Sequence, residues 1–262
     1  RCEAAVDSTR DHATTTSGST PEAGHGEPHA TAADTARRAD RRSASGQRRV
    51  TTMTGQRLAS WVYAEEFVPE DDRLLDARAS GERLGATPVG ASTGAALRVL
   101  AATLSATSVV EIGTGAGVSG LWLLRGMPAD GVLTTIDTSA EHQRSAKASF
   151  AAEGIPHQRT RVITGQALEV LPRLADGAYD LVVVDGDKRE YPAYAEQAAR
   201  LLRRGGAMAL DNMLWHDAVA DPAARDETTR TLRDLGKALR DDERFVTTLL
   251  PVGDGLLVAV KR

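Results

Sequence analysis

The 262-residue sequence is poor in several features, and each shortage excludes a class of protein. A single cysteine, Cys2, rules out a disulfide within the chain and favours a reducing compartment. No apolar run approaches the ~18–20 residues of a membrane span, and the first residues lack the apolar stretch of a signal peptide. Basic residues are not in excess, since 32 Lys and Arg stand against 36 Asp and Glu, which disfavours a dedicated nucleic-acid binder. We expect a soluble, cytoplasmic protein without a membrane partner.

Residues 1–52 lack Leu, Ile, Phe, Tyr and Trp altogether. Such a segment cannot bury enough apolar surface to offset the entropy lost on ordering, so we expect a disordered extension. It ends in an arginine cluster: Arg37, Arg38, Arg41, Arg42, Arg48 and Arg49. The cluster could be a basic arm for nucleic acid or membrane. A solvated tail, or translated sequence upstream of a start at Met53, is the interpretation we favour, also because the chain begins with Arg.

Residues 53–262 have the pattern of one sizeable globular domain. The apolar spacing predicts three helices, over 55–67, 70–84 and 93–105. Strands and helices then alternate, with strands over 108–113, 132–137, 161–165, 179–185 and 206–212 and helices over 118–127, 140–153, 167–175, 190–203 and 225–240. Two final strands, 245–252 and 255–262, form a hairpin. This order predicts an α/β fold with a mostly parallel seven-stranded sheet, helices on both faces and a C-terminal antiparallel hairpin.

A glycine-rich motif, Glu111-Ile112-Gly113-Thr114-Gly115-Ala116-Gly117, joins the first strand of this series to the next helix. Glycines there allow a tight turn and close approach of a ligand to the backbone. Residues 115–120 also match by letter the G-x-G-x-x-G spacing that binds a pyrophosphate in dinucleotide-binding folds. The carboxylate of Glu111 would sit poorly beside a diphosphate and suits a cationic ligand. The motif therefore favours S-adenosylmethionine over a dinucleotide or a ligand-free turn.

Asp137 ends the second strand of the series, 24 residues after Gly113. An acidic side chain at that place can accept both ribose hydroxyls of an adenosine. The alternative is a helix N-cap, because Asp137 stands just before the helix over 140–153. Thr138 or Ser139 can cap that helix equally well, so we favour the ribose role for Asp137.

Polar side chains also follow the fourth and fifth strands, as Asp185 and as the pair Asp211-Asn212. Ligands gather at the carboxyl ends of parallel strands, and neighbouring strands lie ~5 Å apart. Two carboxylates and an amide suit Mg²⁺ or another hard divalent ion. Each of these residues could instead belong to a turn, but their joint occurrence favours a metal site. Lys188, three residues past Asp185, could act as a base if a cation lowered its pKa; alone it is more often a solvated lysine.

Four stretches together, VVEIGTGAGVSG, VVVDGDKREY, LDNMLW and LPVGDGLLVAVKR, resemble segments of the cation-dependent O-methyltransferases, in that family's order. The family includes catechol and caffeoyl-CoA O-methyltransferases, and the resemblance covers nearly all of 53–262. It implies the Rossmann-like fold of class I S-adenosylmethionine methyltransferases and a homodimer to which the helices before residue 90 contribute. It departs at Gly186, where members often carry a larger residue, and in the substrate loops within 70–90 and 213–227, which match no single substrate.

The resemblance also implies residue roles. Cofactor contacts are implied for Val89, Glu111, Gly113, Thr114, Ser119, Asp137, Ala167 and Asp185. Metal ligands are implied at Asp185, Asp211 and Asn212, a catalytic base at Lys188, and a wall of the substrate pocket at Trp215. The implied cofactors are S-adenosylmethionine and a divalent cation, Mg²⁺ foremost, with Mn²⁺ or Ca²⁺ as other candidates.

The sequence therefore predicts an S-adenosylmethionine-dependent, metal-assisted O-methyltransferase acting on a hydroxylated aromatic small molecule, catechol-like or another vicinal diol. The cation would bind two adjacent substrate oxygens, Lys188 would take a proton, and the oxyanion would attack the methyl group. A tRNA wobble-hydroxyuridine O-methyltransferase of the same fold is the first alternative, favoured by the basic extension and disfavoured by the acidic domain. A nicotinamide-dependent oxidoreductase would leave Glu111 and Asp211-Asn212 without a role, and the retained Lys188 argues against a non-catalytic regulator.

Overall fold

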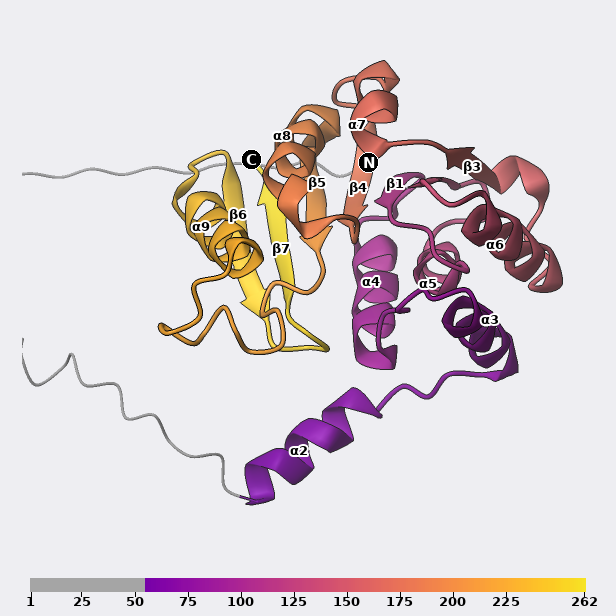
Figure 1. Cartoon of the computed structure of the whole chain (residues 1–262). Coiled ribbons are helices and arrows are strands. Elements are labelled where there is room, and N and C mark those ends of the chain that lie inside the picture. The colour runs from indigo at the N-terminus through magenta and orange to yellow at the C-terminus, as the bar shows by residue number, and fades with distance from the viewer. Residues whose placement is uncertain (1–54) are drawn as a thin grey trace, which may run out of the picture. The chain divides into compact units, whose positions relative to one another are not determined.

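The chain divides into two units, residues 1–52 and residues 53–262, and the computed structural model describes residues 55–262. The extension predicted to be disordered lies outside the described residues. Seven strands of the described part form one sheet in the order β3-β2-β1-β4-β5-β7-β6 (Figure 1). The strands are β1 (Ser108–Ile112), β2 (Val132–Asp137), β3 (Thr160–Thr164), β4 (Tyr179–Val184), β5 (Leu202–Leu210), β6 (Phe245–Leu250) and β7 (Leu256–Lys261).

Strands β1 to β5 run parallel, and β7 enters between β5 and β6 as an antiparallel strand. The predicted fold class is confirmed: a mostly parallel seven-stranded sheet with a C-terminal hairpin. The predicted strands differ from the observed ones by a few residues at their ends, the range over which element boundaries are weakly encoded.

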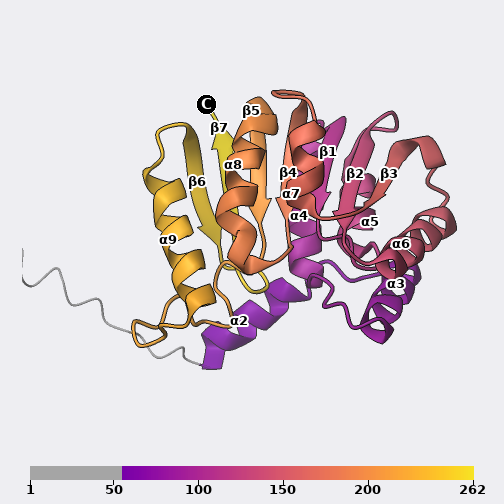
Figure 2. The ribbon, with the colours of Figure 1, turned by 45° about the horizontal axis from the view of Figure 1, so that its top comes forward.

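Helices cover both faces of the sheet. Figure 2 looks onto the face covered by α7 (Ala167–Val170), α8 (Tyr191–Leu201) and α9 (Glu227–Asp241). The opposite face packs against α4 (Ala91–Thr103), α5 (Val118–Gly126) and α6 (Ala140–Ala152), with α3 (Asp72–Arg83) beside α5 and α6. Helix α2 (Gly55–Glu65) precedes them. Within residues 55–262, none of the helices has the length and apolarity required to cross a bilayer.

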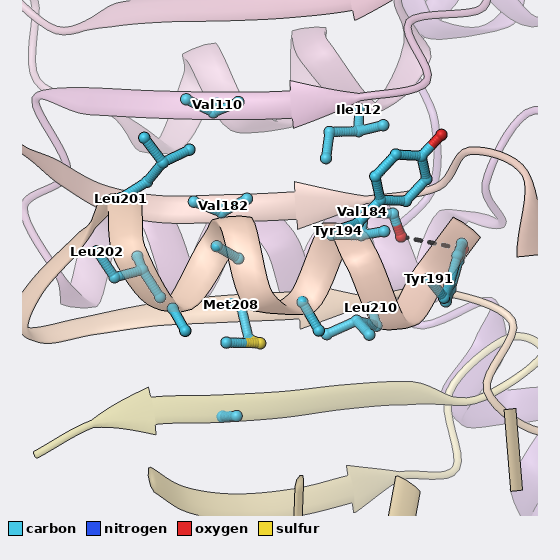
Figure 3. Packing of buried hydrophobic residues seen from close by; sticks show 14 of the residues in the cluster. Val110, Ile112, Val182, Val184, Tyr191, Tyr194, Leu201, Leu202, Met208 and Leu210 are labelled. Carbon is cyan, nitrogen blue, oxygen red and sulfur yellow. Dashed lines mark hydrogen bonds between the residues drawn. The ribbon is translucent and has the colours of Figure 1, made fainter. Parts of the chain in front are cut away.

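The apolar strands are explained by burial on both faces. In β1, Val110 and Ile112 belong to the core under α8, whereas Val109 belongs to the core under α4 and α5. Strand β4 repeats the alternation. Val182 lies on the first side (Figure 3), and Leu181 belongs to the core on the other. Fully burying one such side chain stabilises the fold by about 1.5–3 kcal/mol. Strands buried on both faces read as continuous apolar runs, which is why they were easy to find in the sequence.

Two predicted elements end earlier than expected. The helix predicted over 190–203 ends at Leu201, and β5 starts at once with Leu202, which is fully buried and pairs with Tyr179 of β4. A shift in the β4–β5 register after Tyr179 accommodates the glycines before Ala207. The helix predicted over 167–175 stops after one turn, because Pro172 cannot donate the next backbone hydrogen bond, and a 3-10 turn, η2 (Leu171–Arg173), follows.

The register of the parallel strands sets the position of the residues that follow them. Val184 of β4 is paired with Leu210 of β5, so Asp185 and Asp211 leave neighbouring strands at the same level. The backbone N–H of Asp211 donates to the carbonyl of Val184 at 3.0 Å, which extends the ladder one residue past the strand end. The fold therefore brings both aspartates to one edge of the sheet, as the sequence predicted.

Candidate active site

A cavity of about 560 Å³ opens at the edge where the parallel strands end. Ten residues singled out in the sequence line it: Val89, Gly113, Thr114, Ser119, Asp137, Asp185, Lys188, Asp211, Asn212 and Trp215. A second cavity, of about 430 Å³, adjoins it and shares Gly113, Asp137 and Asp185. Ala167 lines only this second cavity, and Glu111 lines neither. The fold thus gathers every predicted site residue except Glu111 around two connected spaces.

The glycine loop has the left-handed backbone that glycine favours. Gly113, Gly115 and Gly117 have φ values of +92°, +51° and +92°. The loop is tied to β2 through Asp137, whose Oδ2 accepts hydrogen bonds from the backbone N–H groups of Thr114 at 3.1 Å and Gly115 at 3.0 Å. Hydrogen bonds within the protein therefore hold the loop in this conformation.

The carboxylate of Asp137 accepts more hydrogen bonds from the protein backbone than the sequence suggested. Its Oδ1 also accepts from the backbone N–H of Ser139 at 2.8 Å. Ser139 caps α6, accepting from the N–H of His142, so the cap does not depend on Asp137. An ionised carboxylate offers about four acceptor positions, so three backbone contacts leave Asp137 able to accept from a ligand hydroxyl.

Glu111 is fully buried behind the loop rather than in the cavity. Its Oε2 accepts from the Thr135 hydroxyl at 2.6 Å, and the Thr135 hydroxyl lies 2.6 Å from that of Thr114. The Gln143 amide of α6 donates to Thr114 at 3.0 Å. Because a carboxylate only accepts, the donors run in one direction, from Gln143 through Thr114 and Thr135 to Glu111.

This buried chain changes the meaning of two predicted residues. The hydroxyl of Thr114 accepts from Gln143 and donates to Thr135, so it has no hydrogen left to donate to a ligand. Glu111 also accepts from Ser119, which does line the cavity, while its Oε1 has no hydrogen-bond partner. Burial, more than any other influence, raises the pKa of Glu111 to about 7.

The carboxylates at the strand ends are crowded together. Asp211 is 3 % exposed, and its Oδ1 is buried without a hydrogen-bond partner. Burial and the charge of Asp185 raise the pKa of Asp211 to about 7. Burial likewise raises the pKa of Asp185, against the opposing pull of Lys188. The raised pKa values reflect burial and the repulsion between two neighbouring carboxylates when both are ionised. A cation bound between them would relieve this repulsion.

Asn212 adds a neutral oxygen, a potential metal ligand, to the two carboxylates. Its backbone is left-handed, with φ of +57°, a conformation that asparagine tolerates better than most residues. Within residues 55–262, no three His, Cys, Asp or Glu side chains converge as a metal-binding group. The donor set present is two carboxylates and one amide, all oxygen ligands.

Lys188 begins the 3-10 turn η3 (Lys188–Glu190), which Asp187 caps. Its Nζ donates to Asp185 Oδ1 at 2.8 Å and to the Tyr191 hydroxyl at 2.8 Å. Tyr191 is fully buried, and burial raises the pKa of its phenol well above the usual value. Lys188 therefore reaches the cavity with two of its hydrogens already directed to partners.

The far wall of the first cavity comes from the segment after β5. Trp215 and His216 both have left-handed backbones, with φ of +49° and +53°. The N–H of His216 donates to Asp254 Oδ1, in the turn between β6 and β7, at 2.7 Å. From α9, Arg233 donates to four backbone carbonyls of the same segment, at Ala218, Val219, Asp221 and Ala224, over 2.8–3.1 Å. One side chain thus holds the backbone of residues 218–224, which follow the cavity-lining Trp215 and His216.

A second tie reaches the cavity from α2. Glu65 accepts from the Ser92 hydroxyl, at the start of α4, and from the backbone N–H of Gly253 at 2.9 Å. Thr93, next to Ser92, lines the cavity, and its buried hydroxyl has no partner. The sequence did not single out Glu65 or Thr93, because their contacts join segments far apart in the chain.

Three further residues of the site were also missed. Tyr191 follows Lys188 by three residues, a helical spacing that could have indicated the pair. Thr135 and Gln143 carried no such signal. Gly186, noted in the sequence as unusually small, lies against Tyr194: a Cβ there would come within 3.1 Å of the tyrosine ring. Gly186 and Tyr194 both line the second cavity, so the missing side chain at Gly186 leaves room for the Tyr194 ring.

Comparison with known proteins agrees with this geometry. A family model described as O-methyltransferase matches residues 70–262. A Mycobacterium sp. (strain JLS) protein with an O-methyltransferase name is 48 % identical over 200 residues, 76 % of this chain and 91 % of that one. The O-methyltransferase TomG of Streptomyces achromogenes, solved with S-adenosylmethionine, is 30 % identical and superposes with a TM-score of 0.70 over 80 % of this chain and 99 % of that one. A Bacillus cereus O-methyltransferase solved with S-adenosylhomocysteine is 26 % identical, with a TM-score of 0.70 over 78 % and 100 % of the two chains.

Proposed function

The chain belongs to the O-methyltransferase family and uses S-adenosylmethionine, and from this premise we propose that it methylates one hydroxyl of a catechol-like or other vicinal-diol molecule with the help of a divalent cation. The family match selects methyl transfer over the nicotinamide-dependent and non-catalytic interpretations of the sequence. The observation that carries the finer proposal is the gathering of Asp185, Lys188, Asp211 and Asn212 on one cavity that also contains the glycine loop.

The two cavities suggest how the cofactor lies. Ala167 lines the second cavity, which suits the adenine. Asp137 lines both cavities, where it could accept hydrogen bonds from the ribose hydroxyls. The methionine end would then follow the loop from Gly113 to Ser119 into the first cavity. Glu111 lies one contact behind Ser119, and the positive charge of a bound cofactor would favour its ionised form. When bound, the cofactor supplies the methyl group on a positively charged sulfur.

Asp185, Asp211 and Asn212 fit a hard divalent cation by donor chemistry. The unpartnered Oδ1 of Asp211 and the raised pKa values of both carboxyls support this fit, because a cation would relieve both. Such a cation would supply a positive charge that lowers the pKa of a substrate hydroxyl and orients two adjacent oxygens. The proposal of a diol rests on that property.

The remaining steps belong to the protein's own side chains. Lys188 reaches the cavity beside Asp185 and is placed to accept the hydroxyl proton on Nζ. Trp215, which lines the same cavity as the loop, offers an apolar surface to an aromatic ring. Holding the two reactants in line would contribute much of the acceleration, since effective molarities of well-aligned groups reach about 10⁵–10⁸ M.

The proposed homodimer has support from α2 and the residues after it. Five large apolar side chains there are 40–69 % exposed: Leu58, Trp61, Val62, Tyr63 and Phe67. Exposed apolar side chains that gather on one segment commonly mark an interface. Sedimentation of the full chain and of a Trp61→Glu, Phe67→Glu variant tests this: a dimer that becomes monomeric supports the proposal, and a monomeric parent chain refutes it.

The function is tested by methyl transfer from S-adenosylmethionine to caffeic acid, hydroxycinnamoyl thioesters, flavonoids and tRNA, with Mg²⁺, Mn²⁺, Ca²⁺ or excess chelator. We expect turnover of a diol that chelator abolishes and Mg²⁺ restores. Titration of Mn²⁺ into the protein without substrate, followed by its paramagnetic signal, should give one site that Asp211→Asn weakens at least tenfold. Undiminished turnover in chelator would remove the cation from the proposal, and methylation of tRNA alone would favour the nucleic-acid alternative.

A further inference from the structure

Lys188, the proposed base, donates a hydrogen bond to the side chain of Tyr191, a residue without a role in the proposed function. Tyr191 opens α8, is fully buried, and directs its hydroxyl toward the ends of β4 and β5 (Figure 3). The hydroxyl lies 3.2 Å from the carbonyl oxygen of Val184, 3.1 Å from that of Asp211 and 2.8 Å from Lys188 Nζ. The Lys188 ammonium also lies 4.8 Å from the centre of the Tyr191 ring.

Counting hydrogens fixes the direction of these contacts. A phenol has one hydrogen, carbonyl oxygens only accept, and the Lys188 ammonium has no acceptor, so the Tyr191 hydrogen points to Val184 or Asp211. The phenolic oxygen must therefore accept from Lys188. Lys188 Nζ in turn donates one hydrogen to Tyr191 and another to Asp185 Oδ1.

Only one tetrahedral position of Nζ is then left. In the ammonium it carries the third hydrogen, and in the neutral amine it carries the lone pair that would accept a proton. Because Lys188 lines the first cavity and two positions of its Nζ face Tyr191 and Asp185, the third position is the one left for a ligand. Without the phenolic hydroxyl, Nζ would keep a single partner and could rotate about its terminal bond.

We propose that Tyr191 is a positioning residue for Lys188: its hydroxyl, fixed by the carbonyls of Val184 and Asp211, holds the amine so that its third position faces the substrate. The inference rests on the proposed role of Lys188 as base. The alternative is that Tyr191 only fills the core, since its ring belongs to the apolar cluster under α8.

Tyr191→Phe separates these roles, because it keeps the ring and removes the hydroxyl. We expect kcat to fall on the order of tenfold, which is only part of the 10²–10⁴-fold that a general base contributes, because Lys188 itself is retained. The KM values of both substrates and the affinity for S-adenosylhomocysteine should stay within about twofold, since alignment rather than binding is lost. Tyr179→Phe is the matched control: Tyr179 is buried in the same cluster, at the opposite end of β4, and should leave kcat unchanged.

A readout without turnover comes from acetylation of Lys188 by an amine-selective reagent, followed by mass spectrometry on the protein without substrate. Freeing Nζ should increase its labelling several-fold in Tyr191→Phe and leave it unchanged in Tyr179→Phe. Equal labelling and equal kcat in parent and Tyr191→Phe would overturn the inference.

A double-mutant cycle distinguishes this inference from the proposed function. If Tyr191 acts through Lys188, its tenfold effect on kcat should shrink below about twofold in a Lys188→Met background. Full turnover by Lys188→Met alone would refute the base itself. A slow Lys188→Met variant beside a fully active Tyr191→Phe variant would refute only the positioning role. Should Lys188→Met have no measurable rate, the labelling result decides.

Discussion

Gly113 lies against the backbone carbonyl of Asp185, so closely that a Cβ on Gly113 would come within 2.2 Å of that oxygen. The contact joins the glycine loop to the end of β4. It is reinforced by the backbone N–H of Asp185, which donates to Ile112 at 2.8 Å. The cofactor loop and the candidate metal ligand therefore share one close backbone contact.

Gly113→Ala should disturb both functions of that edge. The added methyl group must displace the end of β4, and a left-handed backbone costs a further 1–2 kcal/mol or so in any residue with a Cβ. We expect S-adenosylhomocysteine affinity to fall at least tenfold by calorimetry, with a lower free energy of unfolding. Gly85→Ala is the control, because Gly85 has φ of +76° and nothing within 4 Å of its missing Cβ. Gly85→Ala should lower the free energy of unfolding and leave S-adenosylhomocysteine affinity unchanged. Equal losses of affinity in both variants would contradict a specific role for the Gly113–Asp185 contact.

Asp137→Asn should weaken the loop that Asp137 organises. The amide presents hydrogens to backbone N–H groups of Thr114 or Ser139, and an unpaired buried donor costs about 1–3 kcal/mol. We expect at least a tenfold loss of S-adenosylhomocysteine affinity. Ser139→Ala, which removes the cap of α6, should lower stability by about 1 kcal/mol and leave binding unchanged. Unchanged binding in Asp137→Asn would show that the loop keeps its shape without this carboxylate.

Glu111 predicts a pH-dependent stability. Its pKa is raised from 4.5 to about 7, so between these values the folded chain keeps a proton that the unfolded chain has released. The contribution of Glu111 to the free energy of unfolding therefore falls as pH rises through this window and levels off above it. As pH rises from 4.5 to 8, the free energy of unfolding of Glu111→Gln should increase relative to that of the parent by on the order of 3 kcal/mol. Urea unfolding at a series of pH values measures this; parallel curves for both proteins would contradict the raised pKa.

Arg233→Met should loosen the wall of the first cavity. Four carbonyls from Ala218 to Ala224 lose their donor, while α9 keeps its apolar face. We expect the KM of the methyl acceptor to rise about tenfold, with hydrogen exchange increased over 214–224 and S-adenosylhomocysteine affinity unchanged. Arg240→Met, which removes a surface pair with Asp241, should change none of these. An unchanged KM beside increased exchange would mean that this segment does not contact the acceptor.

The sequence predicted what periodicity and strand ends encode. Apolar runs located the strands, and a parallel sheet necessarily brings residues that follow its strands to one edge, which is why Asp137, Asp185 and Asp211 could be grouped in advance. The order of the strands then placed Asp185 beside Asp211 through the pairing of β4 with β5.

Contacts between separate elements were not predictable in this way. Gln143 reaches Thr114 only because α6 packs across β2 and β3, and nothing near Gln143 in the chain indicates that approach. Glu65 contacts Gly253 across 188 positions of sequence. The burial that withdraws Glu111 from the cavity is likewise a result of packing, since its motif alone suggests direct contact with a ligand.

The place of β7 in the sheet bears on how the protein is made. Strand β5, whose end carries Asp211, pairs on one side with β4 and on the other with β7, the last strand in the chain. During synthesis, one edge of β5 stays unpaired until residues 256–261 leave the ribosome, and β6 has no partner before then. A nascent chain stalled short of that point exposes a strand edge open to aggregation. Completion of the catalytic edge should therefore wait for the synthesis of residues 256–261, which form β7.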